Sequence, residues 1–309
     1  TLSAKDRPGV VEAWALPDPL LPLAIRAATR NDEDKLATAL QRLAVEDSSV
    51  RLDRGHGDQL VLWTTGQAHA DLVLGRLVER YQVRVEQEEL KIPMRETFTG
   101  KADAMGRHVK QSGGHGQFGD CKVRFEPLPR GGGFEFVDEV KGGTIPGQFL
   151  PAVEKGVRQV LSGGAVAGYP MQDVRVIVYD GKHHPVDSKE IAFVTAGKKA
   201  FLTAIRAARP VVLEPIAHIE VTAPESAMGA ITGDLSGRRG IVNGTGGGSR
   251  ATLVVKGQAP MAELAGYQTR LNAMTAGQGS YTLTLSHYDM VPPAVQQQLT
   301  DAYQVQDEE

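Results

Sequence analysis

One stretch, residues 169–210, constrains the fold more than any other part of the chain. Valines alternate with other residues over 174–178, and this period of two, rich in β-branched side chains, predicts a strand. Apolar residues then return at helical spacing over 191–205, which predicts a helix that stops before Pro210. The polar segment 180–186 joins the two elements and lacks an apolar cluster that would fold it onto a core. A loop held between two firm elements is a candidate functional site.

The start of this helix carries a signal of its own. Asp187 is followed by Ser188 and Lys189 and then, three residues on, by the acid Glu190. This is the pattern of a helix N-cap with a reciprocal acid, which satisfies the free N–H groups of the first turn. We therefore expect Asp187 to cap the helix beside the loop.

The composition is that of an ordinary soluble protein with room for two or three cores. The 309 residues are 41% apolar and 23% charged, with a formal net charge of −3, so nucleic-acid contact would need a local basic patch. The single cysteine, Cys121, excludes an internal disulfide framework and fits a reducing compartment. No run approaches the roughly 20 apolar residues that cross a bilayer, and no signal peptide is visible. Because the chain begins at Thr1 without a methionine, we expect it to be part of something longer.

Five segments follow from the pattern of strands, helices and prolines. Residues 1–20 are proline-rich and predict a linker or the tail of a preceding domain. Residues 21–92 and 213–291 each show a strand–helix–strand–strand–helix–strand order, which predicts two ferredoxin-like βαββαβ domains of an α+β protein. Residues 93–212 lie between them and contain the opening stretch. Residues 292–309 form a C-terminal tail in which a short helix is expected.

A second loop candidate is the glycine-rich run Gln111–Gly116, between strands predicted over 97–110 and 117–125. Its backbone N–H groups could cradle a phosphate, although spacing alone favours a hairpin turn that needs glycine. It is not a P-loop, because the pattern GxxxxGK[ST] occurs nowhere in the chain. We therefore expect neither nucleotide hydrolysis nor another catalytic site in this chain.

Several motifs, in unbroken order, give the chain a family resemblance. They read SGGHGQFGDCKVRFEPL, EVKGGTIPGQFLPAVEKGV, AGYPMQDVRVIVYDGKHHPVDSKEIAF, LEPIAHIEVTAPESAMGAITGDLSGRRG and YTLTLSHYD. From about Leu21 to about Val291 the sequence resembles the C-terminal half of bacterial elongation factor G, a translational GTPase. The resemblance implies three domains of that factor. Two ferredoxin-like domains would flank a ribosomal-protein-S5-like domain, a tRNA-mimicking arm with a left-handed βαβ crossover.

The resemblance also implies a role for both loops. In the family, two loops at the tip of the fourth domain contact the tRNA–mRNA duplex in the decoding site during translocation. By motif these loops are Ser112–Phe118 and Gly181–Ser188, and His184 falls at the family's tip histidine. Glycines would let the backbone approach phosphates, while lysine and histidine can donate to phosphate or ribose oxygens. The implied contacts are Ser112, Gly113, Gly114, His115, Gly116, Gln117, Gly181, Lys182, His183, His184, Val186, Asp187 and Ser188.

The partners implied by the resemblance are the 70S ribosome, its RNA and the tRNA–mRNA duplex. We expect a cytoplasmic monomer without membrane association. No cofactor or metal is expected in this chain, since GTP and Mg²⁺ would bind the GTPase domain of the parent protein.

Departures from the family pattern indicate an elongation-factor-G-like paralogue rather than the housekeeping factor. His115 replaces the usual arginine of the first loop, and His183 and Pro185 stand where tyrosine and aspartate are usual in the second. In the fifth domain, Asn272 and Gln278 stand where arginines are usual. Translocation, weak translocation, ribosome recycling or a stress role would fit such a paralogue.

Three further alternatives stay open. A ribosomal-protection protein of the tetracycline-resistance type is a close relative, but the short Gly181–Ser188 loop resembles a translocase tip more closely. A metal-assisted hydrolase could use His183, His184 and Asp187, without support for a third ligand or a general base. A structural arm could also transmit motion without touching RNA.

Overall fold

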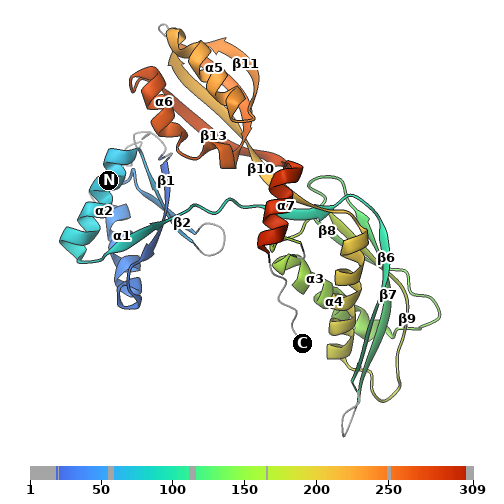
Figure 1. Cartoon of the computed structure of the whole chain (residues 1–309). Coiled ribbons are helices and arrows are strands. Elements are labelled where there is room, and N and C mark those ends of the chain that lie inside the picture. The colour runs from blue at the N-terminus through green and yellow to red at the C-terminus, as the bar shows by residue number, and fades with distance from the viewer. Residues whose placement is uncertain are drawn as a thin grey trace, which may run out of the picture. The chain divides into compact units, whose positions relative to one another are not determined.

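The protein is described by a computed structural model that covers residues 19, 21–54, 59–110, 116–164, 166–248 and 252–303 (Figure 1). These residues form two compact units, one from those up to Pro93 with Ala217–Ser286, the other from Met94–Ile216 with those from His287 on. The rest of the predicted linker and the acidic end lie outside the described residues. The predicted α+β class is confirmed, with several sheets and helices between their strands. None of the described helices is long and apolar enough to cross a membrane.

The first part of the chain forms a four-stranded sheet with two helices. Its strands lie in the order β2-β3-β1-β4, and each neighbouring pair is antiparallel, which is the split-βαβ arrangement. Apolar side chains of both helices close the core against the sheet, among them Leu40, Leu43 and Leu77. The elements are β1 (Leu21–Ala27), α1 (Glu33–Glu46), β2 (Arg51–Arg54), β3 (Leu60–Thr64), α2 (Gln67–Tyr81) and β4 (Val85–Glu88).

The last part repeats this element order. Its strands lie in the order β11-β12-β10-β13, equivalent to that of the first sheet. Its second helical segment is divided, because Gly266 has a left-handed φ of 66° between a 3-10 turn, Met261–Leu264, and α6. The elements are β10 (Pro210–Pro224), α5 (Met228–Gly237), β11 (Ile241–Gly247), β12 (Thr252–Pro260), α6 (Tyr267–Thr275) and β13 (Ser280–Met290).

The second unit is built on another four-stranded sheet, ordered β6-β7-β9-β8. The first two pairs are antiparallel, whereas β8 and β9 are parallel and α3 connects them, so they form a βαβ crossover. The handedness of this crossover stays a prediction. The elements are β6 (Ala102–Lys110), β7 (Gln117–Pro127), β8 (Phe134–Asp138), α3 (Leu150–Gly163), β9 (Val174–Lys182) and α4 (Glu190–Ala207).

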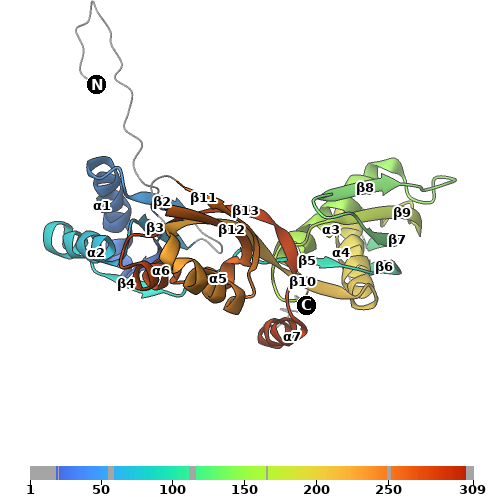
Figure 2. The same cartoon turned by 90° about the horizontal axis from the view of Figure 1, so that it is seen from above.

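Helices α3 and α4 lie side by side against one face of this sheet (Figure 1 and Figure 2). Phe125 of β7 packs edge-on against Phe201 of α4, with ring centroids 5.1 Å apart. At the helix crossing, a Cβ on Gly156 would meet the backbone of Val194, so the two helices touch at backbone level. This contact fixes α4 on the sheet, and with it the loop that precedes α4.

A buried carboxylate organises the base of the second unit. Glu96 of β5 (Arg95–Phe98) is 0% exposed, and its side chain accepts the N–H groups of Val166, Ala167 and Tyr169 at 3.0, 2.7 and 2.9 Å. Beside it, β5 pairs with the start of β10, and a helix, α7 (Pro293–Ala302), follows the last strand. Apolar periodicity gave no sign of Glu96, because its partners lie about 70 residues further along the chain.

Candidate functional site

The two loops predicted to act together begin at the same end of the second unit's sheet (Figure 1). In the β6–β7 hairpin, Lys110 is opposite Gln117, and on the other side of β7 Lys182 is opposite Asp120. The register therefore brings the start of β7 next to the end of β9. Of the predicted contacts, Ser112, Gly113, Gly114 and His115 lie outside the described residues, whereas Gly116, Gln117 and the second loop are described.

Hydrogen bonds tie the second loop to the start of β7. Asp187 Oδ1 accepts the N–H of Gly116 at 3.1 Å, and the Asp187 carbonyl accepts the N–H of Phe118 at 2.9 Å. Ser188 Oγ donates to the Phe118 carbonyl at 2.9 Å. A Cβ on Gly116 would lie 2.9 Å from the Asp187 carboxyl carbon, so a side chain there would have to displace the Asp187 carboxylate. The structure thus brings the described parts of both predicted loops together.

The predicted helix cap is wrong. Helix α4 begins at Glu190 with Lys189 at its N-cap position, and no side chain caps its N-terminus. Asp187 is turned away from the helix because the Gly116 N–H, distant in sequence, competes for its carboxylate. A local sequence pattern cannot show such a competitor.

His184 is held by its own loop. Its ring Nδ1 accepts the backbone N–H groups of Val186 and Asp187 at 3.3 and 3.1 Å. The backbone N–H of His184 itself donates to Ser188 Oγ at 2.9 Å. The Asp187 Oδ2 atom is 3.4 Å from Nδ1, farther than either amide nitrogen. The ring centroid lies 6.3 Å from that of Phe118, and 51% of the side chain is exposed. His184 is therefore both oriented and accessible.

Two lysines and a second histidine share this end of the sheet with His184. Lys182, His183 and Lys110 are exposed at this end of the sheet. The Nδ1 atom of His183 lies 3.1 Å from the carbonyl oxygen of Thr144, which can only accept, so this nitrogen donates. The Arg107 guanidinium lies 5.9 Å from the Phe118 ring centroid. The sequence alone did not predict a role for Arg107. The pairing of β6 with β7 in a hairpin is the signal that could have placed this residue near the loops.

On the strands that lead into the loops, acidic side chains balance the charge of basic ones. The Lys122 ammonium donates to Asp180 Oδ2 at 2.8 Å and lowers the pKa of that carboxyl below its usual value. The Gly181 N–H and Coulomb attraction to Lys122 act in the same direction. Positive charge is thus balanced on β7 and β9 and gathers at the loops, where a polyanion would meet it.

The described residues hold no group of three or more His, Cys, Asp or Glu side chains that could bind a metal. The Nδ1 atoms of both His183 and His184 already bond to backbone groups. The metal-assisted hydrolase therefore finds no support in the geometry.

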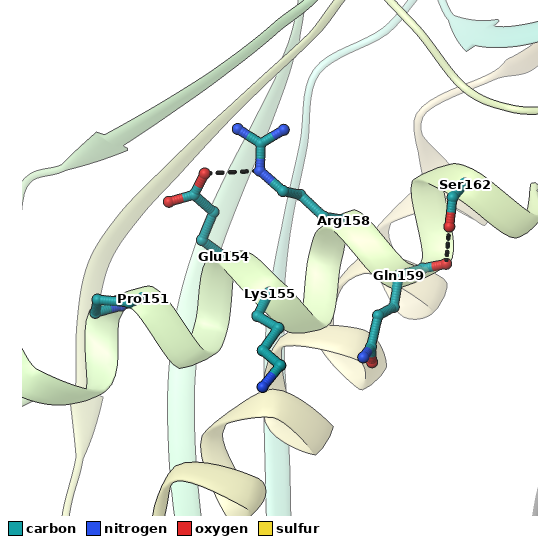
Figure 3. Close-up of a pocket in the computed structure, with 6 residues that line it drawn as sticks. All are labelled: Pro151, Glu154, Lys155, Arg158, Gln159 and Ser162. Atoms are coloured by element: carbon teal, nitrogen blue, oxygen red, sulfur yellow. Dashed lines mark hydrogen bonds and ion pairs between the residues drawn. The ribbon is translucent and has the colours of Figure 1, made fainter.

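A shallow hollow of about 370 Å³ on α3 offers another surface (Figure 3). Arg158 Nε bonds Glu154 at 2.8 Å and its guanidinium lies 4.0 Å over the Phe134 ring, while Lys155 pairs with Glu190 at 3.2 Å. The two cationic side chains that line this hollow, Arg158 and Lys155, are thus already paired with groups of the same unit. The lining residues are Pro151, Glu154, Lys155, Arg158, Gln159 and Ser162.

Comparison with known proteins gives matches over most of the chain. Family models match consecutive parts of the chain: elongation factor G domain III over 16–89, domain IV over 90–209 and the elongation factor G C-terminus over 211–299. The elongation factor G-like proteins of two Mycobacterium tuberculosis strains, CDC 1551 / Oshkosh and ATCC 25618 / H37Rv, are each 48% identical over 293 residues, which are 94% of this chain and 41% of theirs.

A crystal structure of a protein from Thermus thermophilus has a TM-score of 0.84 and 37% identity, covering 96% of this chain and 45% of that one. The chain thus spans less than half the length of the relatives that it matches. Fold and matches together define a part of an elongation factor. The chain belongs to the elongation factor G family, and it corresponds to domain III, domain IV and the C-terminal domain.

Proposed function

We propose that the chain is the ribosome-binding part of an elongation factor G-like GTPase and that its tip loops contact the tRNA–mRNA duplex in the decoding site. The observation that carries this proposal is the group of hydrogen-bond donors at one end of the sheet, where Lys182, His183 and His184 are exposed on a loop that is bonded to the start of β7. Lysine and histidine donors beside glycine backbone suit phosphate and ribose oxygens. Family membership supports the same assignment.

We also propose a third domain over 21–92, a fourth over 93–212 and a fifth over 213–291. The three family models begin within a few residues of these boundaries. The partners would be the 70S ribosome and its RNA, met by a monomer in the cytoplasm. GTP and Mg²⁺ would act in the GTPase domain of the full-length protein, and this chain would itself hydrolyse nothing.

In this proposal the loops act as a wedge that promotes tRNA–mRNA translocation. Ribosome recycling is the second candidate, and the second loop itself favours it. His183 and Pro185 depart from the usual tip sequence, and His183 is bonded back to Thr144 rather than free to meet RNA through Nδ1. The relatives named above also carry the description elongation factor G-like protein.

Alanine substitutions in the full-length factor test the proposal. We expect Lys182→Ala and His184→Ala each to slow single-round translocation by about tenfold, the equivalent of one good hydrogen bond to RNA. Lys199→Ala, an exposed lysine on α4, is the matched control and should leave the rate unchanged. If both tip variants translocate and split ribosomes at the normal rate, the tip contact is disproved. If they slow only ribosome splitting, recycling replaces translocation as the function.

A further inference from the structure

Two side chains of the second loop, those of Asp187 and Ser188, make hydrogen bonds that hold neighbouring residues in place. Asp187 and Ser188 are directed at the neighbouring loop and at His184, and neither caps the helix that follows. We infer that Asp187 and Ser188 are positioning residues, which hold His184 as a hydrogen-bond donor through Nε2 and join the two tip loops into one recognition surface. The biological meaning of this inference rests on the proposed RNA contact, whereas its geometry does not.

The hydrogen bonds determine which ring nitrogen of His184 carries the proton. A neutral imidazole has one N–H donor and one acceptor nitrogen. Two backbone N–H groups, from Val186 and Asp187, point at Nδ1 at 3.3 and 3.1 Å. A proton on Nδ1 would point at both amide donors, and the Asp187 Oδ2 atom that could accept such a proton lies farther away at 3.4 Å, so Nδ1 is the acceptor and Nε2 carries the proton. The half-exposed ring then presents Nε2–H outward, toward an acceptor such as a phosphate oxygen, a ribose hydroxyl or a base carbonyl.

Ser188 creates the turn that brings those amides to the ring. Its Oγ accepts the His184 N–H at 2.9 Å, and its own N–H donates to the His184 carbonyl at 3.1 Å. The same hydroxyl donates to the Phe118 carbonyl at 2.9 Å. A hydroxyl supplies one donor and can accept as well, so Ser188 uses both capacities to link its own turn to β7.

Asp187 links His184 to the start of β7 through three of its own groups. Its backbone N–H meets His184 Nδ1, its carbonyl accepts the Phe118 N–H, and its carboxylate accepts the Gly116 N–H. Only the last of these bonds depends on the side chain. Removing the carboxylate should therefore free the Gly116 amide and leave the His184 turn closed, whereas removing the Ser188 hydroxyl should open the turn itself.

Nitrogen NMR of the histidine rings in the 309-residue chain tests the inference without a ribosome. Under alkaline conditions that deprotonate imidazoles, we expect His184 to be a single Nε2–H tautomer with a hydrogen-bonded Nδ1. In Ser188→Ala the Nδ1 signal should move toward that of free imidazole, and exchange of the Asp187 amide should quicken about tenfold. Ser188→Thr keeps the hydroxyl and should restore both readings. A proton on Nδ1 in the unaltered chain, or a Ser188→Ala ring identical to it, would overturn the inference.

The Asp187 carboxylate allows a second, independent test. Asp187→Ala should speed exchange of the Gly116 amide about tenfold, while Asp187→Asn, which keeps an acceptor oxygen, should not. Unchanged exchange at amides of β9 would show that each variant is folded. If Gly116 exchange is the same in all three proteins, the side-chain link between the loops does not exist.

The full-length factor separates this inference from the proposed function. When both hold, Ser188→Ala slows translocation and Ser188→Thr restores it. If Ser188→Ala changes the ring and yet leaves translocation and splitting untouched, the positioning role stands and the RNA contact fails. If translocation falls while the ring is unchanged, the positioning role is wrong and the RNA contact survives.

Discussion

A carboxylate between two arginines, Asp234, joins α5 to α6. Its Oδ2 lies 2.8 Å from Arg238 Nε and its Oδ1 lies 2.9 Å from Arg270 Nε. Burial by itself raises the pKa of Asp234, but the hydrogen bonds and attraction of both arginines outweigh it, so the pKa lies below the ordinary value of 3.8. The ionised form is thus the one that the folded protein prefers.

The sign of this shift gives a pH prediction. Because the folded-state pKa is depressed, Asp234 stabilises the fold above the unfolded value of 3.8, and this contribution is lost as the pH falls through the folded value. We expect Asp234→Asn to cost about 1–2 kcal/mol of unfolding free energy near neutral pH, and we expect this cost to shrink progressively as the pH falls below 3.8. Thermal unfolding at a series of pH values measures this gap.

Asp53→Asn, at an exposed carboxylate of β2, is the control for the loss of one charge and should change the unfolding free energy near neutral pH by less than about 0.5 kcal/mol. A stability difference between the Asp234 variant and the unaltered chain that stays constant from neutral pH to about pH 3 would refute the ion-pair account.

At the scale of elements, the helix pair α3–α4 is where backbone contact matters most. A Cβ on Gly156 would meet the Val194 carbonyl, and one on Gly197 would lie 2.6 Å from the Val153 carbonyl oxygen. Neither obstacle is a flexible side chain, so alanine must push the helices apart. These two glycines therefore set how closely α4 lies to α3.

Gly156→Ala should lower the unfolding free energy by about 2 kcal/mol, because the overpacked helices must shift. Gly163→Ala is the matched control, since it lies in the same helix with open space around its Cβ, and there alanine should be neutral or slightly stabilising. Urea unfolding followed by circular dichroism compares the two. Equal stability of the two variants would show that the crossing tolerates a side chain.

Periodicity predicted these elements well where they are amphipathic. The strand seen over 174–178 became β9, and the helix seen over 191–205 became α4, because each buries one face against the same core. Prediction failed where long-range polar contacts decide the structure. Asp187 matched a cap and met Gly116 instead, and the buried Glu96 gave no local signal. Lys182 and His184 could be proposed from motif, but the place of their loop beside the start of β7 depends on the register between β7 and β9.

At the scale of the molecule, charge is distributed unevenly. The chain carries a formal net charge of −3. On the sheet strands of the second unit cations are paired with acids, as between Lys101 and Glu126 at 2.9 Å and between Arg175 and Glu135 at 2.7 Å. At the tip, Lys182, His183 and His184 are instead exposed on the second loop, and Lys110 is exposed at the end of β6. A polyanion such as ribosomal RNA should therefore be attracted locally, by few contacts, and not by the whole surface.

Few contacts imply a weak binding that depends measurably on salt. Each lysine that neutralises a phosphate releases counterions, so the logarithm of the affinity falls linearly with the logarithm of the salt concentration. We expect the chain to bind 70S ribosomes more weakly as salt rises from about 50 to 200 mM, and Lys182→Ala to reduce the slope by about 1. Lys199→Ala, with the same loss of charge on α4, should leave the slope unchanged. If both variants reduce it equally, general charge and not the tip governs ribosome binding, and the proposed contact surface must lie elsewhere.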